Sequence, residues 1–121
     1  MTSFVMSLWS IELEPEVERW LESLAAGQFA IVASRIEYLA EHGASTRMPR
    51  SRSLGDGLFE LRFDLDQKVQ RITFFFPGGK RVVLLTTFRK QRQNERTEVA
   101  RARLTMARCI AEGHTVEGET E

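Results

Sequence analysis

Three consecutive apolar segments lie between residues 54 and 96, and two of them carry arginines in their interiors. The segments read LGDGLFELRF, QRITFFF and PGGKRVVLLTTFRKQRQNER. Their β-branched and aromatic residues, separated by turn residues, predict three successive antiparallel strands. An arginine inside a strand keeps its charge and needs acceptors or water around it. A sheet with several cations on one face predicts an anion-binding surface, and we favour a nucleic-acid backbone as the anion.

The flanking segments predict one further strand and three helices. Trp9, Ile11 and Leu13 alternate with polar residues, which is typical of a short edge strand. The remaining elements that we expect are a helix from Glu14-Pro15-Glu16 to a break at Gly27, a second helix ending at Gly43, a basic loop over 44–57, strands near 58–64, 69–76 and 81–89, and a helix from about Asn94. The order βααβββα predicts an α+β fold in which the helical pair packs on a small, mainly antiparallel, twisted sheet.

The charge is distributed unevenly although the chain is neutral overall. Residues 1–43 carry two arginines and seven acidic residues, a net charge of −5, whereas residues 44–111 carry fifteen basic and six acidic residues, a net charge of +9. Residues 112–121 add four glutamates. A neutral total does not exclude a polyanionic ligand, because the local field steers it. We expect one domain over 1–111 and an acidic, flexible tail over 112–121.

Composition excludes several other classes of protein. One cysteine, Cys109, and two distant histidines do not make a set of metal ligands, and no motif predicts a cofactor. No apolar run approaches the length of a membrane span, and the first residues lack the pattern of a secretory signal. We therefore expect a cytoplasmic protein that does not associate with membranes.

The turns between the predicted strands determine which side chains face each other. A two-residue turn at Asp66-Gln67 places Arg62 opposite Arg71. A turn at Gly78-Gly79 then places Arg71 opposite Thr86. With this register one face is an apolar core of Phe59, Leu61, Phe63, Ile72, Phe74, Phe76, Val83 and Leu85. The other face is polar and holds Glu60, Arg62, Arg71, Thr73, Leu84, Thr86 and, at the end of its strand, Lys90.

Arg62, Arg71 and Lys90 therefore converge on the polar face. Directly opposed arginines repel, so an anion or a carboxylate such as Glu60 or Asp64 is expected between them. In one interpretation each arginine merely pairs with those acids and is half exposed. We favour a phosphate site, because further cations lie beside the three, namely Arg89, Arg92 and Arg96.

The succession MPRSRSLGDGLFELRF, QRITFFF and VVLLTTFRKQRQNERTEVARAR resembles the phage-derived branch of the HigB/RelE toxins of type II toxin–antitoxin systems. The resemblance covers roughly residues 8–110. The chain departs from the family pattern at Arg89-Lys90, where Lys-Lys is commoner, and at Gln91–Glu95, which lacks a proline before the last helix. The resemblance implies a RelE-like fold and a metal-independent ribonuclease that cuts messenger RNA on the ribosome. It also implies a cognate antitoxin, which we expect to be a helix-turn-helix protein.

By this resemblance Arg62, Arg71 and Lys90 correspond to basic positions of the active site. The two arginines would clamp a phosphate, and Lys90 would stabilise charge in the transition state or protonate the leaving group. The RNA-binding residues expected around them are Arg50, Arg52, Arg89, Arg92 and Arg96.

The sequence does not identify a general base. His42 and His114 lie outside the polar face, and Glu60 is either the base or the partner of Arg62 in an ion pair. Of the phenylalanines at 74–76 only Phe75 points to the basic face, where it is a candidate for base stacking. We expect the arginines of the last helix to lie on its solvated side, where they alternatively attract ribosomal RNA or an acidic antitoxin segment; these are Arg101, Arg103 and Arg108.

Two other functions fit the same pattern. A ParE-like toxin that inhibits DNA gyrase shares the fold, although it has less need of basic residues at the strand positions. A non-catalytic, phage-derived nucleic-acid-binding protein would also use the basic face, and its binding would depend on salt.

Overall fold

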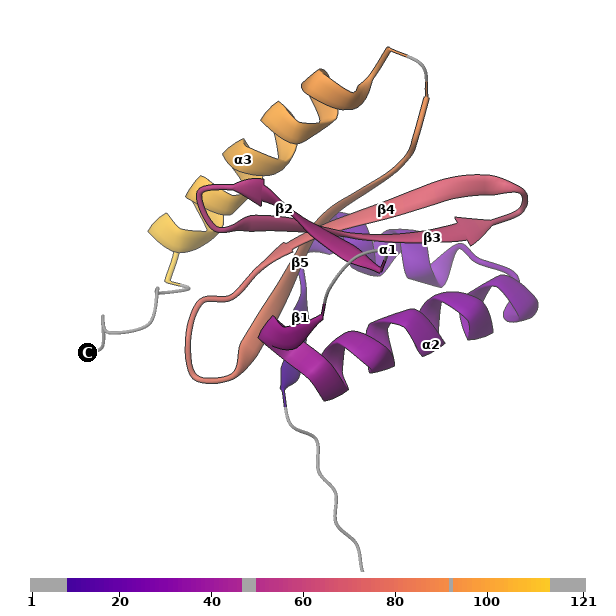
Figure 1. The fold of residues 1–121 in the computed structure, drawn as a ribbon, viewed down its shortest axis with the longest axis horizontal. Coiled ribbons are helices and arrows are strands. Elements are labelled where there is room, and N and C mark those ends of the chain that lie inside the picture. Colours follow the sequence, from indigo (N-terminus) through magenta and orange to yellow (C-terminus); the bar gives the residue numbers. More distant parts are fainter. Residues whose placement is uncertain (1–8, 47–49, 92, 114–121) are drawn as a thin grey trace, which may run out of the picture.

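The computed structural model describes residues 9–46, 50–91 and 93–113, which form a five-stranded sheet with helices against both of its faces (Figure 1). The elements are β1 (Ser10–Leu13), α1 (Pro15–Glu22), α2 (Ala26–His42), a short 3₁₀ turn (Gly43–Ser45), β2 (Ser51–Gly55), β3 (Leu58–Leu65), β4 (Lys68–Phe75), β5 (Arg81–Arg89) and α3 (Glu95–Ala111). The strand order is β1-β5-β4-β3-β2, with β1 parallel to β5 and the other pairs antiparallel. The predicted α+β class is confirmed. None of the helices in these segments is long and apolar enough to cross a membrane.

Two predictions about the connections are wrong. The segment 44–57 is not entirely a loop, because Ser51–Gly55 forms β2 and pairs antiparallel with β3. The break between α1 and α2 lies at residues 23–25, and Gly27 is inside α2. The predicted end of α2 at Gly43 is confirmed.

The register between β3 and β4 is the predicted one. Asp66 and Gln67 both have positive φ, as a tight hairpin turn requires, and Arg62 faces Arg71. The predicted register between β4 and β5 is wrong, because Arg71 faces Phe88 instead of Thr86. The loop over 76–80 is longer than a two-residue turn, and a β-bulge shifts the pairing next to Thr73.

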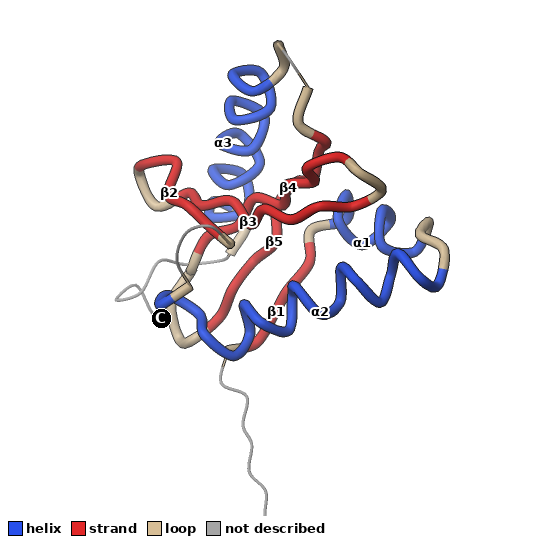
Figure 2. Tube along the Cα trace, turned by 45° about the vertical axis from the view of Figure 1, so that its right-hand side comes forward, coloured by secondary structure: helices blue, strands red, loops and turns tan. Residues whose placement is uncertain are grey.

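The sheet has an apolar core on each face. Figure 2 shows α1 and α2 on one side of the sheet and α3 on the other. The face toward α1 and α2 buries Leu61, Phe63, Leu65, Ile72, Phe74, Val82 and Leu84 against Val17, Val32 and Leu39, with Phe59 and Phe76 at its margin. The face toward α3 buries Leu58, Phe75, Val83 and Leu85 against Ala102 and Cys109. The expectation of one apolar and one polar face is therefore wrong for Val83, Leu84 and Leu85, each of which lies on the face opposite to the predicted one. Polar residues of the α3 face are confined to the end near Arg71.

Gly43 allows α2 to end against Trp9, which leads into β1. Its φ is +50°, and a Cβ at this position would overlap the indole ring of Trp9. We expect Gly43→Ala to lower the free energy of unfolding by about 2–3 kcal/mol, since backbone strain and overpacking add. Gly27→Ala is the matched control: nothing lies within 4 Å of the added methyl group, so helix propensity should raise stability by about 0.5–1 kcal/mol. Urea denaturation of both variants tests this, and equal stabilities would contradict it.

Candidate anion-binding site

A cluster of three arginines surrounds Glu60 at the end of the sheet near α3. We call Arg52 of β2, Arg62 of β3 and Arg71 of β4 the arginine cluster. Glu60 is fully buried, and its two carboxylate oxygens accept hydrogen bonds from Arg52 Nε at 2.8 Å and Arg71 Nη1 at 3.3 Å. Arg62 Nε lies 3.8 Å from the same carboxylate. Glu60 therefore relieves the repulsion between arginines that face each other on adjacent strands.

Arg71 lies deepest in the cluster. Its exposed fraction is 1 %, and its guanidinium carbon lies 5.8 Å from the centroid of the Phe88 ring. Glu95 supplies a second carboxylate, 3.4 Å from Arg71 Nη1. Arg71 Nε is buried and has no hydrogen-bond partner among the residues that the structure describes. The buried guanidinium is thus held by two acids, while Arg52 and Arg62 occupy the more exposed side of the cluster.

Glu95 links α3 to the cluster from the first turn of that helix. Its carboxylate accepts a hydrogen bond from Arg52 Nη2 at 2.6 Å in addition to its contact with Arg71. Partial burial raises the pKa of Glu95, but the charge of Arg71 and the hydrogen bond from Arg52 outweigh it, so the pKa lies below its ordinary value. Three arginines and two glutamates leave one net positive charge at the site.

Glu95→Gln should lower the free energy of unfolding slightly at pH 7, and the size of this loss should depend on pH. Because its side chain is 43 % exposed, we expect a loss of less than about 1 kcal/mol at pH 7. The pKa of Glu95 is lowered by folding, so its contribution is present above the ordinary pKa and is lost as pH falls through the folded-state value. Urea denaturation at pH 7, 4 and 3 should show the difference from wild type shrinking on acidification. A constant difference would contradict this assignment.

The other predicted site residues are only partly brought together. Lys90 directly follows β5, its side chain is exposed, and its N–H donates to the Val69 carbonyl at 2.9 Å, so it lies beside β4 at the same end of the sheet as the cluster. Arg89 faces Gln70, so alternation points it away from Arg71, and it pairs with Asp66 at 3.9 Å.

Two further predicted RNA-binding residues, Arg50 and Arg96, lie outside the arginine cluster, and a third, Arg92, is not among the described residues. The guanidinium of Arg50 stacks over Tyr38, 4.1 Å from the ring centroid. Arg96 is exposed on the first turn of α3. Arg92 lies outside the described residues, as does His114.

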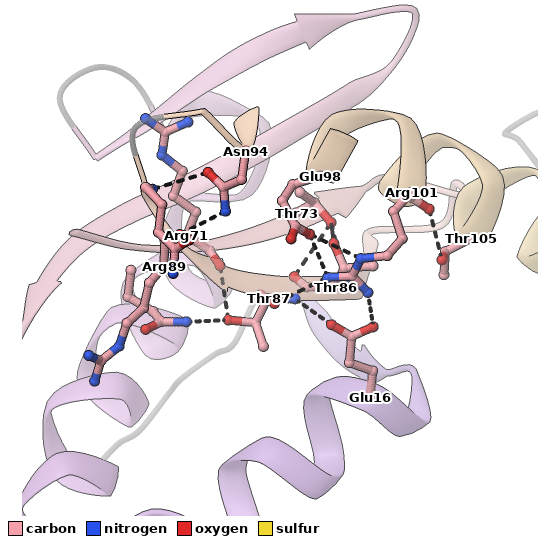
Figure 3. A network of polar contacts seen from close by, with 12 residues as sticks. Glu16, Arg71, Thr73, Thr86, Thr87, Arg89, Asn94, Glu98, Arg101 and Thr105 are labelled. Carbon is pink, nitrogen blue, oxygen red and sulfur yellow. Dashed lines mark hydrogen bonds and ion pairs between the residues drawn. The ribbon is translucent and has the colours of Figure 1, made fainter. Parts of the chain in front are cut away.

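Arg101 and Arg103 of α3 are only partly exposed and hold the helix in place, whereas Arg108 is exposed, as expected of a solvated side. Arg101 pairs with Glu16 of α1 and with Glu98, and Glu16 also accepts the N–H of Thr87 (Figure 3). Arg103 donates to the carbonyls of Leu54 and Gly55 in β2. Arg108 lies 3.9 Å from Glu14. These contacts join α3 to the sheet and to α1.

Phe75, Cys109 and His42 are excluded from a catalytic role by their surroundings. Phe75 is 3 % exposed in the core beneath α3, where it does not offer a surface for base stacking. Burial, with Glu14 nearby, raises the pKa of the Cys109 thiol to about 12. His42 stacks on Tyr38, and its Nδ1 lies 2.9 Å from the Tyr38 carbonyl oxygen. Across residues 9–46, 50–91 and 93–113 no group of three or more His, Cys, Asp or Glu side chains is placed to hold a metal ion.

Fold and site together define a small α+β protein with a carboxylate-bridged arginine cluster on its sheet. The family model described as Phage derived protein Gp49-like (DUF891) matches residues 19–109. The match spans more than half of the 121 residues, and the chain belongs to this family. A comparison with curated proteins finds no match.

Proposed function

We propose that this protein is the toxin of a type II toxin–antitoxin pair, an endoribonuclease that cuts messenger RNA on the ribosome and is neutralised by an antitoxin of the helix-turn-helix class. The arginine cluster carries this proposal: three guanidinium groups from adjacent strands are held together by buried Glu60, with Lys90 beside them. Membership of the Gp49-like family and the resemblance to HigB/RelE toxins support it.

The proposed chemistry uses the cations to stabilise a phosphorane-like transition state. The 2′-hydroxyl of the RNA loses its proton to solvent water and attacks the adjacent phosphorus, the bond to the 5′-oxygen breaks, and negative charge grows on the phosphoryl oxygens. Arg52 and Arg62 are placed on the exposed side of the cluster, where they can donate to those oxygens. Lys90 supplies the proton to the departing 5′-oxygen. The ribosome holds the RNA in a geometry that favours the attack, and this positioning accounts for the rest of the rate enhancement.

Glu60 acts in this scheme as the counter-charge that positions the arginines. A carboxylate that is fully buried and bonded to two guanidinium groups has no path to the 2′-hydroxyl. This favours the ion-pair interpretation of Glu60 over its use as a general base.

The test is induced expression with and without the neighbouring gene, followed by primer extension on a reporter messenger RNA. Growth arrest with new codon-phased 5′ ends, both suppressed by the neighbouring gene product, is the expected result. Arrest with intact messenger RNA would contradict the nuclease and point to gyrase or another target. No arrest would contradict a toxin of either kind.

One observation favours a second candidate, a nucleic-acid-binding protein without nuclease activity. Arg71 is buried and already paired with Glu60 and Glu95, which is also the arrangement of a structural ion pair. In that case replacement of cluster residues would weaken RNA binding in a salt-dependent manner and no cleavage would be seen.

A further inference from the structure

A second cationic surface lies next to the arginine cluster, at the junction of α2 with β3. It is a groove of about 450 Å³, lined by Arg35, Arg50, Arg62, Phe63, Asp64 and Val69. Arg35 comes from α2, Arg50 directly precedes β2, and Arg62 lies on β3. Arg62 therefore belongs to both the groove and the cluster.

The groove, like the cluster, has buried guanidinium donors without a hydrogen-bond partner in the described part of the chain. The Nε atoms of Arg35 and Arg62 are buried and have no hydrogen-bond partner in the described part of the chain. Asp64 is the acidic residue of the lining, and no ion pair within 4.0 Å joins it to any of the three arginines. The lining thus carries two net positive charges, whereas the cluster retains one after Glu60 and Glu95 are counted.

The contacts of Arg50 and Phe63 define two sides of the groove. Arg50 stacks on Tyr38 of α2, and the backbone N–H of Arg62 donates to the Arg50 carbonyl at 2.8 Å. Phe63 is almost fully buried, so it closes the floor of the groove and does not offer a face on which a base can stack. Three guanidinium groups around a closed apolar floor suit a phosphate, which is an acceptor with several oxygens, better than a nucleobase.

We propose that the groove binds a backbone phosphate of single-stranded RNA while a neighbouring phosphate of the same strand lies at the arginine cluster. Arg62, shared between the two sites, sets the direction of the strand from α3 across β3 toward α2. The inference rests on the proposed function as far as RNA is the ligand, but it does not require cleavage.

The test measures binding of a 5′-fluorescein-labelled, nine-nucleotide single-stranded RNA by anisotropy over a series of salt concentrations. Arg35→Gln should weaken binding several-fold and reduce the slope of log K against log salt by about 0.7, the contribution of one phosphate contact in a single strand. Arg50→Gln, which changes the arginine that precedes β2, should do the same. Arg19→Gln is the matched control, because Arg19 is exposed on α1 and is not part of the groove. It should leave affinity and slope unchanged.

The outcomes separate this inference from the proposed function. If Arg35→Gln and Arg50→Gln fold normally and bind RNA with the slope of Arg19→Gln, or if the wild-type protein does not bind the RNA, the groove inference is wrong. If the slope falls as expected but no messenger RNA is cut in cells, the groove stands and the nuclease proposal fails.

Discussion

Glu60→Gln is expected to lower the free energy of unfolding by about 3–5 kcal/mol, because it leaves buried guanidinium charge without its counter-charge. Glu60 is fully buried and contacts all three members of the arginine cluster. A glutamine amide keeps one acceptor oxygen but turns an N–H₂ group toward cations. Glu95 is the remaining carboxylate, and it contacts Arg52 and Arg71. Urea denaturation at pH 7 measures the loss.

Glu22→Gln is the matched control for this substitution. Glu22 is an exposed residue at the end of α1, so the same chemical change should alter stability by no more than about 0.5 kcal/mol. A loss below about 1 kcal/mol for Glu60→Gln would be the size expected of a surface ion pair. That result would mean that the arginines do not depend on Glu60.

The sequence predicts the hairpin of β3 and β4 correctly because its turn leaves little freedom. A two-residue connection with positive φ at both positions sets one register, and the alternation of apolar residues in the strands agrees with it. Arg62 therefore faces Arg71 as predicted. Local turn chemistry and strand periodicity both act over a few residues, and both can be read from the sequence.

The register of β5 against β4 cannot be predicted from the sequence in the same way. The loop over 76–80 admits several lengths of turn, and the bulge beside Thr73 depends on contacts made only in the folded sheet, such as the 2.6 Å hydrogen bond between Thr73 Oγ1 and Thr86 Oγ1. Strand β5 is apolar on both sides because helices cover both faces, so alternation gives no signal for its facing.

The composition of the arginine cluster depends on contacts between distant segments. Arg52 lies opposite Glu60 only because 51–55 pairs as a strand, and its serines and glycine read as loop. Glu95 reaches the cluster from a helix 43 residues after Arg52. The alternation of Arg52 with Ser51 and Ser53 is the signal in the sequence that could have predicted the strand and so the position of Arg52. Nothing local distinguishes Glu95 from an ordinary acidic residue in the first turn of a helix.

Lys90→Ala is expected to reduce messenger RNA cleavage by at least about 10²-fold, the scale on which removal of one preorganised donor to a transition state acts, and to relieve growth arrest. The exposed side chain of Lys90 lies outside the ion-pair network, so the stability should not change. Arg71→Ala should also lower cleavage, because it removes a partner of buried Glu60, which positions Arg52 and Arg62, and it is expected to destabilise the protein as well.

Growth curves and primer extension measure the cellular effect, and urea denaturation of purified protein measures folding. Lys80→Ala is the matched control, because Lys80 is exposed and directly precedes β5, at the opposite end of the strand from Lys90. The control should remain as toxic as the parent. If Lys90→Ala is equally toxic, the end of β5 does not contribute to the chemistry. A stable, inactive Lys90→Ala beside a toxic Lys80→Ala would instead separate catalysis from folding, which Arg71→Ala cannot do because it disturbs the buried ion pairs that hold the cluster.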